Sequence, residues 1–320
     1  MPVIRNTSYS APYVLSNRHV ATIVPNLIRF PRGIKYQRER IDTPDGDFLD
    51  LDWSRVGSQR LLIVSHGLES NSRAVCVRGM VKYFNRRNWD ALCWNFRSCS
   101  GEPNRKPHYY HPGMTDDFQL IIDQAESAGY EEIALLGFSM GGAATLRYLA
   151  EKGTRLSPRV KRSVVFSAPT DLGACSENLA DPSLAYYARR FLISYRRKMT
   201  QKEKLYPGSN DLARWDEVQN LPDFDRIFNA PWYGCATTQE FYQLVNTHHR
   251  IPQIEIPSLI VNAENDPFLP ENCYPIDGAG RSNNVFLEIP KMGGHVGFMT
   301  LSWKGIYWSE TRTEAFLNGE

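Results

Sequence analysis

Short runs of apolar and β-branched residues recur along the chain, and most of them are continuous rather than alternating with polar residues. The clearest are RLLIVSHG from Arg60, WDALCWNF from Trp89, EIALLGFS from Glu132, VKRSVVFSAP from Val160, PSLIVNAEND from Pro257 and NVFLEIP from Asn284. Continuous apolar runs of this length are typical of strands that are covered on both faces, as in a parallel sheet. The pattern therefore predicts buried strands at these six places.

Stretches with helical spacing of apolar residues separate the first four runs, at residues 72–86, 115–128 and 142–152. Regular alternation of strands and helices predicts an α/β fold, with a mostly parallel sheet and helices on both faces. Ahead of the first run, Asp45-Gly46 lies between two strand-like stretches of residues 36–53. An Asp-Gly pair in that position predicts a hairpin turn, which would add an antiparallel edge to the sheet.

The alternation breaks after residue 169, in a stretch that is rich in aromatic and charged residues and has helical character. We expect residues 170–252 to form a helical cap inserted into an α/β core of residues 1–169 and 253–320, with an N-terminal extension at 1–35. The aromatic residues of the cap would either line an apolar pocket or pack the cap onto the sheet. They are Tyr186, Tyr187, Phe191, Trp215, Trp232 and Tyr233.

Residues 134–153, ALLGFSMGGAATLRYLAEKG, lead a strand candidate into a group of glycines around Ser139 and then into a helix candidate. A sharp strand-to-helix turn holds its apex residue in a strained conformation, and side chains two positions to either side would clash there. Gly137 and Gly141 meet this requirement, so Ser139 is expected to project as a nucleophile at the start of the helix. An ordinary glycine-rich turn with an idle serine is the alternative interpretation.

A serine hydroxyl attacks only when a base takes its proton and an acid orients that base, and in this kind of sheet the order along the chain is serine, acid, histidine. Asp266 follows a predicted strand, where such a fold presents its site, and Pro267 stops further pairing there. Glu264 is the nearby alternative acid. His295 lies in a glycine-rich loop after the last predicted strand and is the expected base.

Two backbone amides must then face the oxyanion that forms on the substrate. We expect one from Met140, directly after the nucleophile, and one from Leu68, after His66-Gly67 at the end of a predicted strand. His66 itself is expected to support this turn rather than to act as a base.

The composition and charge of the chain limit the classes of partner that we expect it to bind. Lys and Arg number 37 against 35 Asp and Glu, a formal net charge of +2, and basic runs such as residues 195–198 are expected to be solvated helix faces. Nucleic acid is therefore not an expected partner. The six cysteines show no CxxC spacing, so we expect neither a metal nor a disulfide framework, and we expect no cofactor. Neither a secretory signal nor an apolar run of membrane-spanning length is found, so a cytoplasmic location without an integral membrane segment is expected.

The chain resembles the α/β-hydrolase superfamily and, within it, the YheT-like branch. The resemblance covers nearly the whole chain and rests on pieces such as RHVATIVPNLIR, SHGLES, WNFRSCSGEPN, GFSMGG, NDPF and GGHVGF. It implies a hydrolase fold with a helical cap and a triad of Ser139, Asp266 and His295. Members are described as hydrolases or esterases, and related branches act on medium-chain esters or lipids. His19 lies in the first piece and is expected to be a buried, hydrogen-bonded histidine.

The residues and the resemblance together predict a serine hydrolase that cleaves a carboxylic ester through an acyl-enzyme intermediate, with a short- to medium-chain acyl group. Two alternatives stay open. An acyltransferase could use the same nucleophile, because access of water decides between the two reactions. A small-molecule binding protein with little or no catalysis could keep the same fold. The expected substrate is a small-molecule ester or a lipid-like molecule, and the sequence gives no oligomeric state.

Overall fold

The computed structural model describes residues 3–106, 109–208 and 211–320, and within these ranges a nine-stranded sheet organises the chain. The strands are β1 (Val3–Ile4), β2 (Gln37–Asp42), β3 (Phe48–Ser54), β4 (Arg60–Ser65), β5 (Asp90–Asn95), β6 (Glu132–Phe138), β7 (Val160–Phe166), β8 (Ser258–Val261) and β9 (Val285–Glu288). Their order across the sheet is β1-β9-β8-β7-β6-β4-β5-β3-β2. Only β3 is antiparallel to its neighbours β5 and β2 among the described pairs, so the predicted α/β architecture is confirmed.

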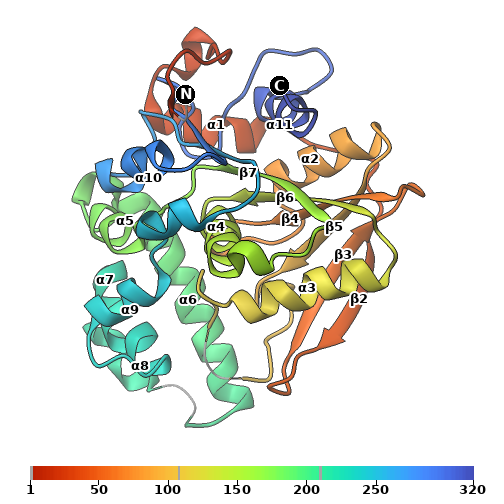
Figure 1. Cartoon of the computed structure of the whole chain (residues 1–320). Helices are drawn as coiled ribbons and strands as arrows, with labels where there is room; N and C mark the ends of the chain where they lie inside the picture. The colour runs from red at the N-terminus through yellow and green to blue at the C-terminus, as the bar shows by residue number, and fades with distance from the viewer. Residues whose placement is uncertain (1–2, 107–108, 209–210) are drawn as a thin grey trace.

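Helices cover both faces of the sheet (Figure 1). On one face lie α2 (Val75–Asn85) and α11 (Trp308–Leu317), and on the other α3 (Thr115–Ser127), α4 (Met140–Lys152) and α10 (Ile276–Gly280). Successive residues of a strand point to opposite faces. In β4, Leu61 and Ile63 pack in the cluster with α3 and α4, whereas Leu62 and Val64 pack in the cluster with α2 and α11. This double burial explains why the strands are continuously apolar.

The predicted hairpin forms the antiparallel edge of the sheet. Arg38 lies directly opposite Asp52, and Arg40 lies directly opposite Asp50. Each guanidinium donates two hydrogen bonds of 2.7–2.9 Å to its carboxylate. Both aspartates are nearly inaccessible to solvent, so the pairing accounts for a strand that carries charges at buried positions.

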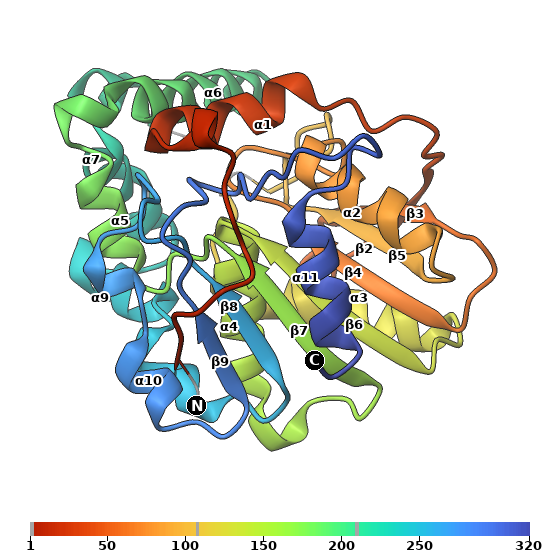
Figure 2. The same cartoon turned by 90° about the horizontal axis from the view of Figure 1, so that it is seen from above.

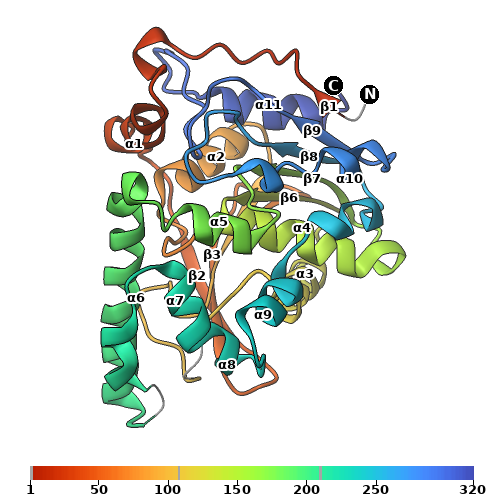
Figure 3. The same ribbon diagram turned by 90° about the vertical axis from the view of Figure 1, so that its left-hand side faces the viewer.

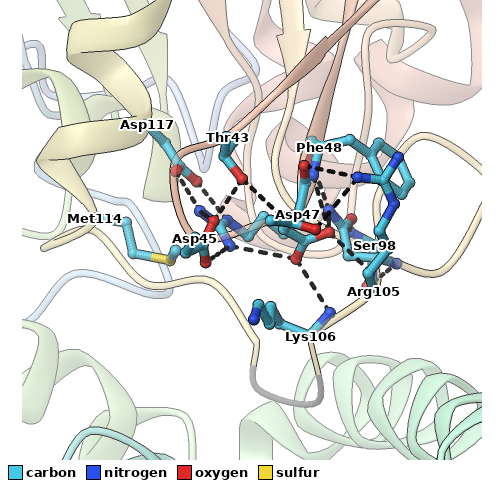
Figure 4. Close-up of polar contacts among 12 residues, drawn as sticks. Thr43, Asp45, Asp47, Phe48, Ser98, Arg105, Lys106, Met114 and Asp117 are labelled. Atoms are coloured by element: carbon cyan, nitrogen blue, oxygen red, sulfur yellow. Dashed lines mark hydrogen bonds and ion pairs between the residues drawn. The ribbon is translucent and has the colours of Figure 1, made fainter.

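A buried arginine fastens this hairpin to the rest of the core. Arg97, in the loop after β5, is 5% exposed and donates to Asp117 of α3 at 2.6 and 2.8 Å. It also pairs with Asp45 at 2.7 Å and Asp47 at 3.3 Å in the hairpin turn. Asp47 in addition accepts a hydrogen bond from the side chain of Asn104 at 2.8 Å. Figure 4 shows the three carboxylates gathered around one point, where hairpin, loop and helix meet.

Most of the helices outside the sheet layers lie between β7 and β8, to one side of the sheet (Figure 3). We call residues 172–253 the helical segment. It contains α5 (Leu172–Asn178), a 3₁₀ turn at Pro182–Leu184, α6 (Ala185–Leu205), a 3₁₀ helix at Leu212–Glu217, α7 (Leu221–Phe224), a π-helix at Asp225–Asn229, α8 (Ala230–Trp232), α9 (Thr238–Val245) and a 3₁₀ helix at His248–Gln253. The helical character that the sequence predicts for this stretch is present, while the division of the chain into a core and a cap domain stays a prediction.

The N-terminal extension forms a helix that the sequence pattern does not predict. α1 (Arg18–Ile28) begins after Asn17, whose side chain accepts hydrogen bonds from the amides of His19 and Val20. Figure 2 shows α1 beside α6. A 3₁₀ turn at Tyr13–Leu15 precedes it, and 3₁₀ turns of the same length follow α4 at Gly153–Arg155 and precede α10 at Glu271–Cys273.

Removal of the buried guanidinium should destabilise the fold strongly. Arg97→Met leaves the carboxylates of Asp47 and Asp117 buried without their cation, and we expect the free energy of unfolding to fall by about 3–5 kcal/mol. Chemical denaturation followed by circular dichroism measures this change. Arg214→Met is the control, because Arg214 pairs with Glu217 on an exposed helix face, and it should unfold almost as the wild type does. Equal stability of the two variants would show that the network contributes nothing.

Candidate active site

Ser139 lies at the point where β6 ends and α4 begins. Its backbone has φ 51° and ψ −122°, a strained conformation for a residue with a side chain. The flanking glycines leave room for this turn. A Cβ on Gly137 would lie 2.6 Å from the carbonyl oxygen of Gly141, and a Cβ on Gly141 would lie 2.3 Å from that of Ser65. The tight turn that the sequence predicts is present, and it holds the Ser139 side chain at the N-terminus of α4.

The structure brings the three predicted side chains together. His295 Nε2 lies 2.8 Å from Ser139 Oγ, across 156 positions of sequence. His295 Nδ1 lies 2.9 Å from Asp266 Oδ2 and 3.1 Å from Oδ1. Asp266 is 5% exposed, and His295 is 8% exposed. The alternative acid, Glu264, is exposed to solvent, and no contact joins it to His295 within the described residues.

The loop that carries His295 is fixed from both sides. The Phe268 ring stacks on the imidazole with a centroid distance of 4.1 Å. The amide of His295 donates to Thr22 Oγ1 at 2.9 Å, so α1 holds the backbone of the histidine. Close packing against α1 also demands a glycine at 297, where a Cβ would lie 2.1 Å from the carbonyl oxygen of Ala21. The N-terminal extension is therefore part of the site.

His19 has a different place from the one expected. Its ring is partly exposed rather than buried, and its Nδ1 lies 3.2 Å from the hydroxyl of Tyr187 in α6. The two rings stack with their centroids 5.9 Å apart. The expectation of a hydrogen bond is confirmed, whereas the expectation of full burial is wrong, because α1 packs against α6 along the surface. His19 thus joins α1 to the helical segment.

The two expected oxyanion donors lie beside Ser139. Leu68 and Met140 line the same cavity as Ser139, and their amides donate to no acceptor among the described residues. His66 supports this turn: its Nε2 accepts from the amide of Phe96 at 3.1 Å, so its Nδ1 carries the proton and donates to Gly67 at 2.8 Å. Burial lowers the pKa of His66 to about 3, so the ring stays neutral. Its structural role agrees with the sequence-based expectation.

A buried ion pair holds the residue that follows Leu68. Glu69 has a positive φ of 51°, and its carboxylate accepts from Lys198 Nζ of α6 at 2.9 Å and from the hydroxyl of Ser194 at 2.5 Å. Its amide donates to the hydroxyl of Tyr110 at 2.7 Å. The Lys198 side chain is only 12% exposed. Although burial opposes its charge, Cys99 and Glu69 raise the pKa of Lys198 overall.

This ion pair corrects one expectation from the sequence. The basic run at residues 195–198 was expected to be a solvated helix face, and Arg196 and Arg197 are indeed exposed. Lys198 points inward because a helix turns by about 100° per residue, which places the last cation of the run on the opposite side. The run therefore ends in a buried cation that binds Glu69.

A narrow cavity of about 60 Å³ opens at Ser139 and extends below the helical segment. Apolar side chains of its wall include Leu68, Phe191 and Phe268, and polar side chains of the wall include Ser176, Asp225 and Asn229. Burial raises the pKa of Asp225, and the carboxyl group is held by Ser176, Asn229 and Tyr242 at 2.6–3.0 Å. The cavity wall thus combines apolar and polar side chains.

Of the six aromatic residues considered for the pocket wall, only Phe191 lines this cavity in the part of the chain described. Tyr186 is 66% exposed. Tyr187, Trp215, Trp232 and Tyr233 pack within clusters of the helical segment instead. Packing rather than pocket lining therefore describes most of them.

In residues 3–106, 109–208 and 211–320, no group of His, Cys, Asp or Glu side chains could hold a metal ion. Among the helices of the same ranges, none combines the length and the apolar character needed to cross a bilayer.

The sheet order, the turn at Ser139 and the contacts of His295 define a class of protein. The family model described as alpha/beta hydrolase fold matches residues 60–300, and the chain belongs to this family. The Escherichia coli (strain K12) protein named "Putative esterase YheT" is 32% identical over 293 residues, which cover 89% of this chain and 85% of the relative. "Phospholipase ABHD3" of Mus musculus is 25% identical over 314 residues, or 94% of this chain and 75% of the relative.

Solved structures agree on the fold. The Pyrococcus furiosus esterase Pf2001 matches with a TM-score of 0.59 at 16% identity, and the match covers 98% of this chain and 95% of the other. This likeness concerns the fold alone. Together the comparisons confirm the expected family, and the two sequence relatives are named as a putative esterase and a phospholipase.

Several residues around the site escaped the sequence analysis. Thr22 and Lys198 contact their partners across 273 and 129 positions, and no local pattern reveals such a contact. Phe268 directly follows the NDP turn and could have been singled out as a neighbour of Asp266. Glu69 lies next to an expected oxyanion donor and carries a signal in its charge, because a carboxylate beside an oxyanion would oppose it unless a cation neutralises it.

Removal of one partner of the Glu69–Lys198 ion pair should destabilise the fold. Lys198→Met leaves Glu69 buried without its cation, and we expect a loss of about 3–5 kcal/mol in the free energy of unfolding. The double variant Glu69→Gln/Lys198→Met removes both charges and keeps an acceptor for Ser194, so it should recover most of that loss. Urea denaturation measures both. Arg197→Met, an exposed neighbour, serves as control, and equal losses in the single and double variants would rule out the buried pair.

Proposed function

We propose that the protein is a serine hydrolase of carboxylic esters, with Ser139 as nucleophile, His295 as base and Asp266 as the acid that orients it. The observation that carries the proposal is the chain of contacts from Ser139 Oγ to His295 Nε2 at 2.8 Å and from His295 Nδ1 to Asp266 at 2.9 Å. The expected cytoplasmic location stays a prediction.

In the first half of the reaction, Ser139 Oγ attacks the carbonyl carbon of the ester while His295 Nε2 accepts the hydroxyl proton. The carbonyl π electrons move to oxygen, and the amides of Leu68 and Met140 donate hydrogen bonds to the oxyanion. Asp266 holds the imidazole through Nδ1 and stabilises its charged form. When the tetrahedral intermediate collapses, the bond to the alcohol breaks, and the alcohol takes the proton from His295. The acyl group stays on Ser139.

In the second half, water replaces the alcohol. The oxygen of the water attacks the acyl carbon while His295 accepts a proton from the water. The same two amides bind the new oxyanion. Collapse breaks the bond to Ser139 Oγ, which regains the proton from His295, and the carboxylic acid leaves. An alcohol in place of water would complete an acyl transfer with the same groups.

The cavity favours a short acyl group. If each non-hydrogen atom needs the space of about one water, a cavity of about 60 Å³ holds about five such atoms. Asn229 lines the cavity, and its buried side-chain oxygen accepts no hydrogen bond among the described residues. A longer alkyl chain that covers this oxygen would leave it unsatisfied. The fit is therefore best for acyl groups near butyryl.

An activity-based label tests the nucleophile without knowledge of the substrate. A fluorophosphonate should modify Ser139, as mapped by mass spectrometry, and Ser139→Ala should lower kcat for p-nitrophenyl butyrate by about 10⁴–10⁶. Ser183→Ala, at an exposed turn, is the matched control and should retain full activity. A wild-type protein that neither reacts with the label nor hydrolyses the ester would favour the alternative of a binding protein.

Chain-length profiling tests the cavity. With p-nitrophenyl esters from acetate to dodecanoate, kcat/KM should peak near butyrate. Leu221 lines the cavity and is buried, so Leu221→Ala should extend it and raise the ratio of octanoate to butyrate hydrolysis by about tenfold, the effect of one to two methylene groups in an apolar pocket. Leu205→Ala, on the exposed side of α6, should leave the profile unchanged. A wild-type optimum at dodecanoate would contradict the assignment of this cavity to the acyl group.

A further inference from the structure

Large apolar side chains that face solvent concentrate on one part of the molecule. Among the described residues, three segments contribute eight of them: Tyr13, Val14, Val20, Leu27, Ile28, Phe30, Leu301 and Trp303. We call these eight residues the α1 surface. Exposure reaches 92% for Tyr13 and 108% for Trp303. Single exposed apolar residues are ordinary, but a gathering of this kind marks an interaction site.

The three segments that carry the α1 surface pack against one another. Leu15, Ala21, Met299 and Tyr307 pack together in a small buried cluster that joins the turn at Tyr13–Leu15, α1 and the loop before α11. The hydroxyl of Tyr307 donates to the carbonyl oxygen of Pro25 at 2.9 Å. Figure 2 shows α1 and this loop on the same side of the molecule. The α1 surface is therefore held as a unit rather than scattered over independent loops.

The outward face of α1 carries large apolar residues beside the exposed Arg18 and Asn26, whereas a surface helix normally presents mostly polar residues there. Ala21, Thr22 and Pro25 form its buried face, which packs against the His295 loop. Val20, Leu27 and Ile28 lie on the exposed side, at 37%, 64% and 54% exposure. Packing within the chain explains the first set and leaves the second without a partner in the parts described.

Positive charge borders the apolar residues. A groove of about 780 Å³ lies between Phe30 and Trp303, and its cations are Arg29, Lys82, Arg86, Arg87 and Lys304. Glu310 is the only carboxylate among the described residues that line the groove, and it is already paired with Arg29. Within the described ranges, no carboxylate forms an ion pair with Lys82, Arg86 or Lys304. The groove thus carries an excess of positive charge.

We propose that the α1 surface docks onto an anionic lipid surface. Apolar side chains flanked by lysine and arginine bind in the plane of a membrane interface, with the apolar part among the acyl chains and the cations at anionic headgroups. Tryptophan favours the same interface because its ring is apolar and its N–H is polar. A protein partner would need acidic groups arranged around one fixed shape, whereas a lipid surface supplies both features without such fit.

The docking surface adjoins the proposed catalytic site. The buried face of α1 touches the His295 loop through Thr22. Ile23, one residue further along α1, packs against the cluster of the helical segment that also contacts Leu68 and Phe191. A lipid surface bound to α1 would therefore lie one helix away from His295. The link between docking and catalysis rests on the proposed function, because it places the ester substrate in a lipid surface. Docking itself needs no catalysis.

Vesicle flotation with the Ser139→Ala protein measures docking apart from hydrolysis. The protein should float with phosphatidylcholine vesicles that contain phosphatidylglycerol and bind phosphatidylcholine alone far less. Leu301→Ser/Trp303→Ser should weaken binding to the anionic vesicles by at least about tenfold, and Lys304→Ala by about fivefold. Val56→Ser/Ile276→Ser removes two other exposed apolar residues, at 48% and 41% exposure, and should bind as Ser139→Ala does.

The outcomes separate docking from catalysis. With Ser139 restored, the Leu301→Ser/Trp303→Ser protein should hydrolyse soluble p-nitrophenyl butyrate at the wild-type rate, which shows an intact fold, and Lys304→Ala gives an independent readout at an exposed side chain. Failure of the protein to bind anionic vesicles, with soluble hydrolysis intact, would overturn the docking proposal alone. Vesicle binding without any soluble hydrolysis would overturn the proposed function alone. A dimer in analytical ultracentrifugation that Leu301→Ser/Trp303→Ser abolishes would assign the surface to a second copy and overturn lipid docking.

Discussion

The close approach of two backbone segments at the end of β6 is the constraint on which the site depends. Gly141 has no side chain, so α4 can start directly against the carbonyl oxygens of Ser65 and His66 at the end of β4. The same approach brings the turn with Leu68 beside Ser139. Any side chain at 141 would push these segments apart, and the proposed oxyanion amides would separate from the nucleophile. Strain at Ser139 is sustained because β6 fixes one end of the turn and α4 fixes the other.

The parts of the site that the sheet does not fix are held by elements outside it. α1 holds the backbone of His295 through Thr22, and α6 holds the turn after Leu68 through the ion pair of Lys198 with Glu69. α1 and α6 also contact each other, at His19 and Tyr187. A displacement of α6 would therefore be felt at both the base and the oxyanion turn. This arrangement links the position of the helical segment to the geometry of the reacting groups.

The predictable part of the site follows from local rules. Glycine spacing identified Ser139, and the positions of Asp266 and His295 followed because parallel strands present their carboxyl ends at one edge of the sheet. Lys198 and Thr22 were not predictable, since their roles depend on partners far away in sequence. α1 was not predicted because Pro25 lies within it, and a proline inside an apolar stretch argues against a helix. Arg97 lies in one of the stretches that resemble the family, yet only its contacts with Asp47 and Asp117 explain its role.

The two sides of α1 are subject to different constraints. Its inner side must be small, because Gly297 packs directly against the carbonyl oxygen of Ala21, and it must offer a hydroxyl at 22 to the His295 amide. Neither requirement applies to the outer side of α1. At these positions lysine or glutamate would be equally compatible with the fold. Apolar residues at these outer positions cost solubility without improving the packing of the chain. A partner that is itself apolar and negatively charged would account for these residues next to a cation-rich groove, and it would meet the protein beside His295, the proposed base.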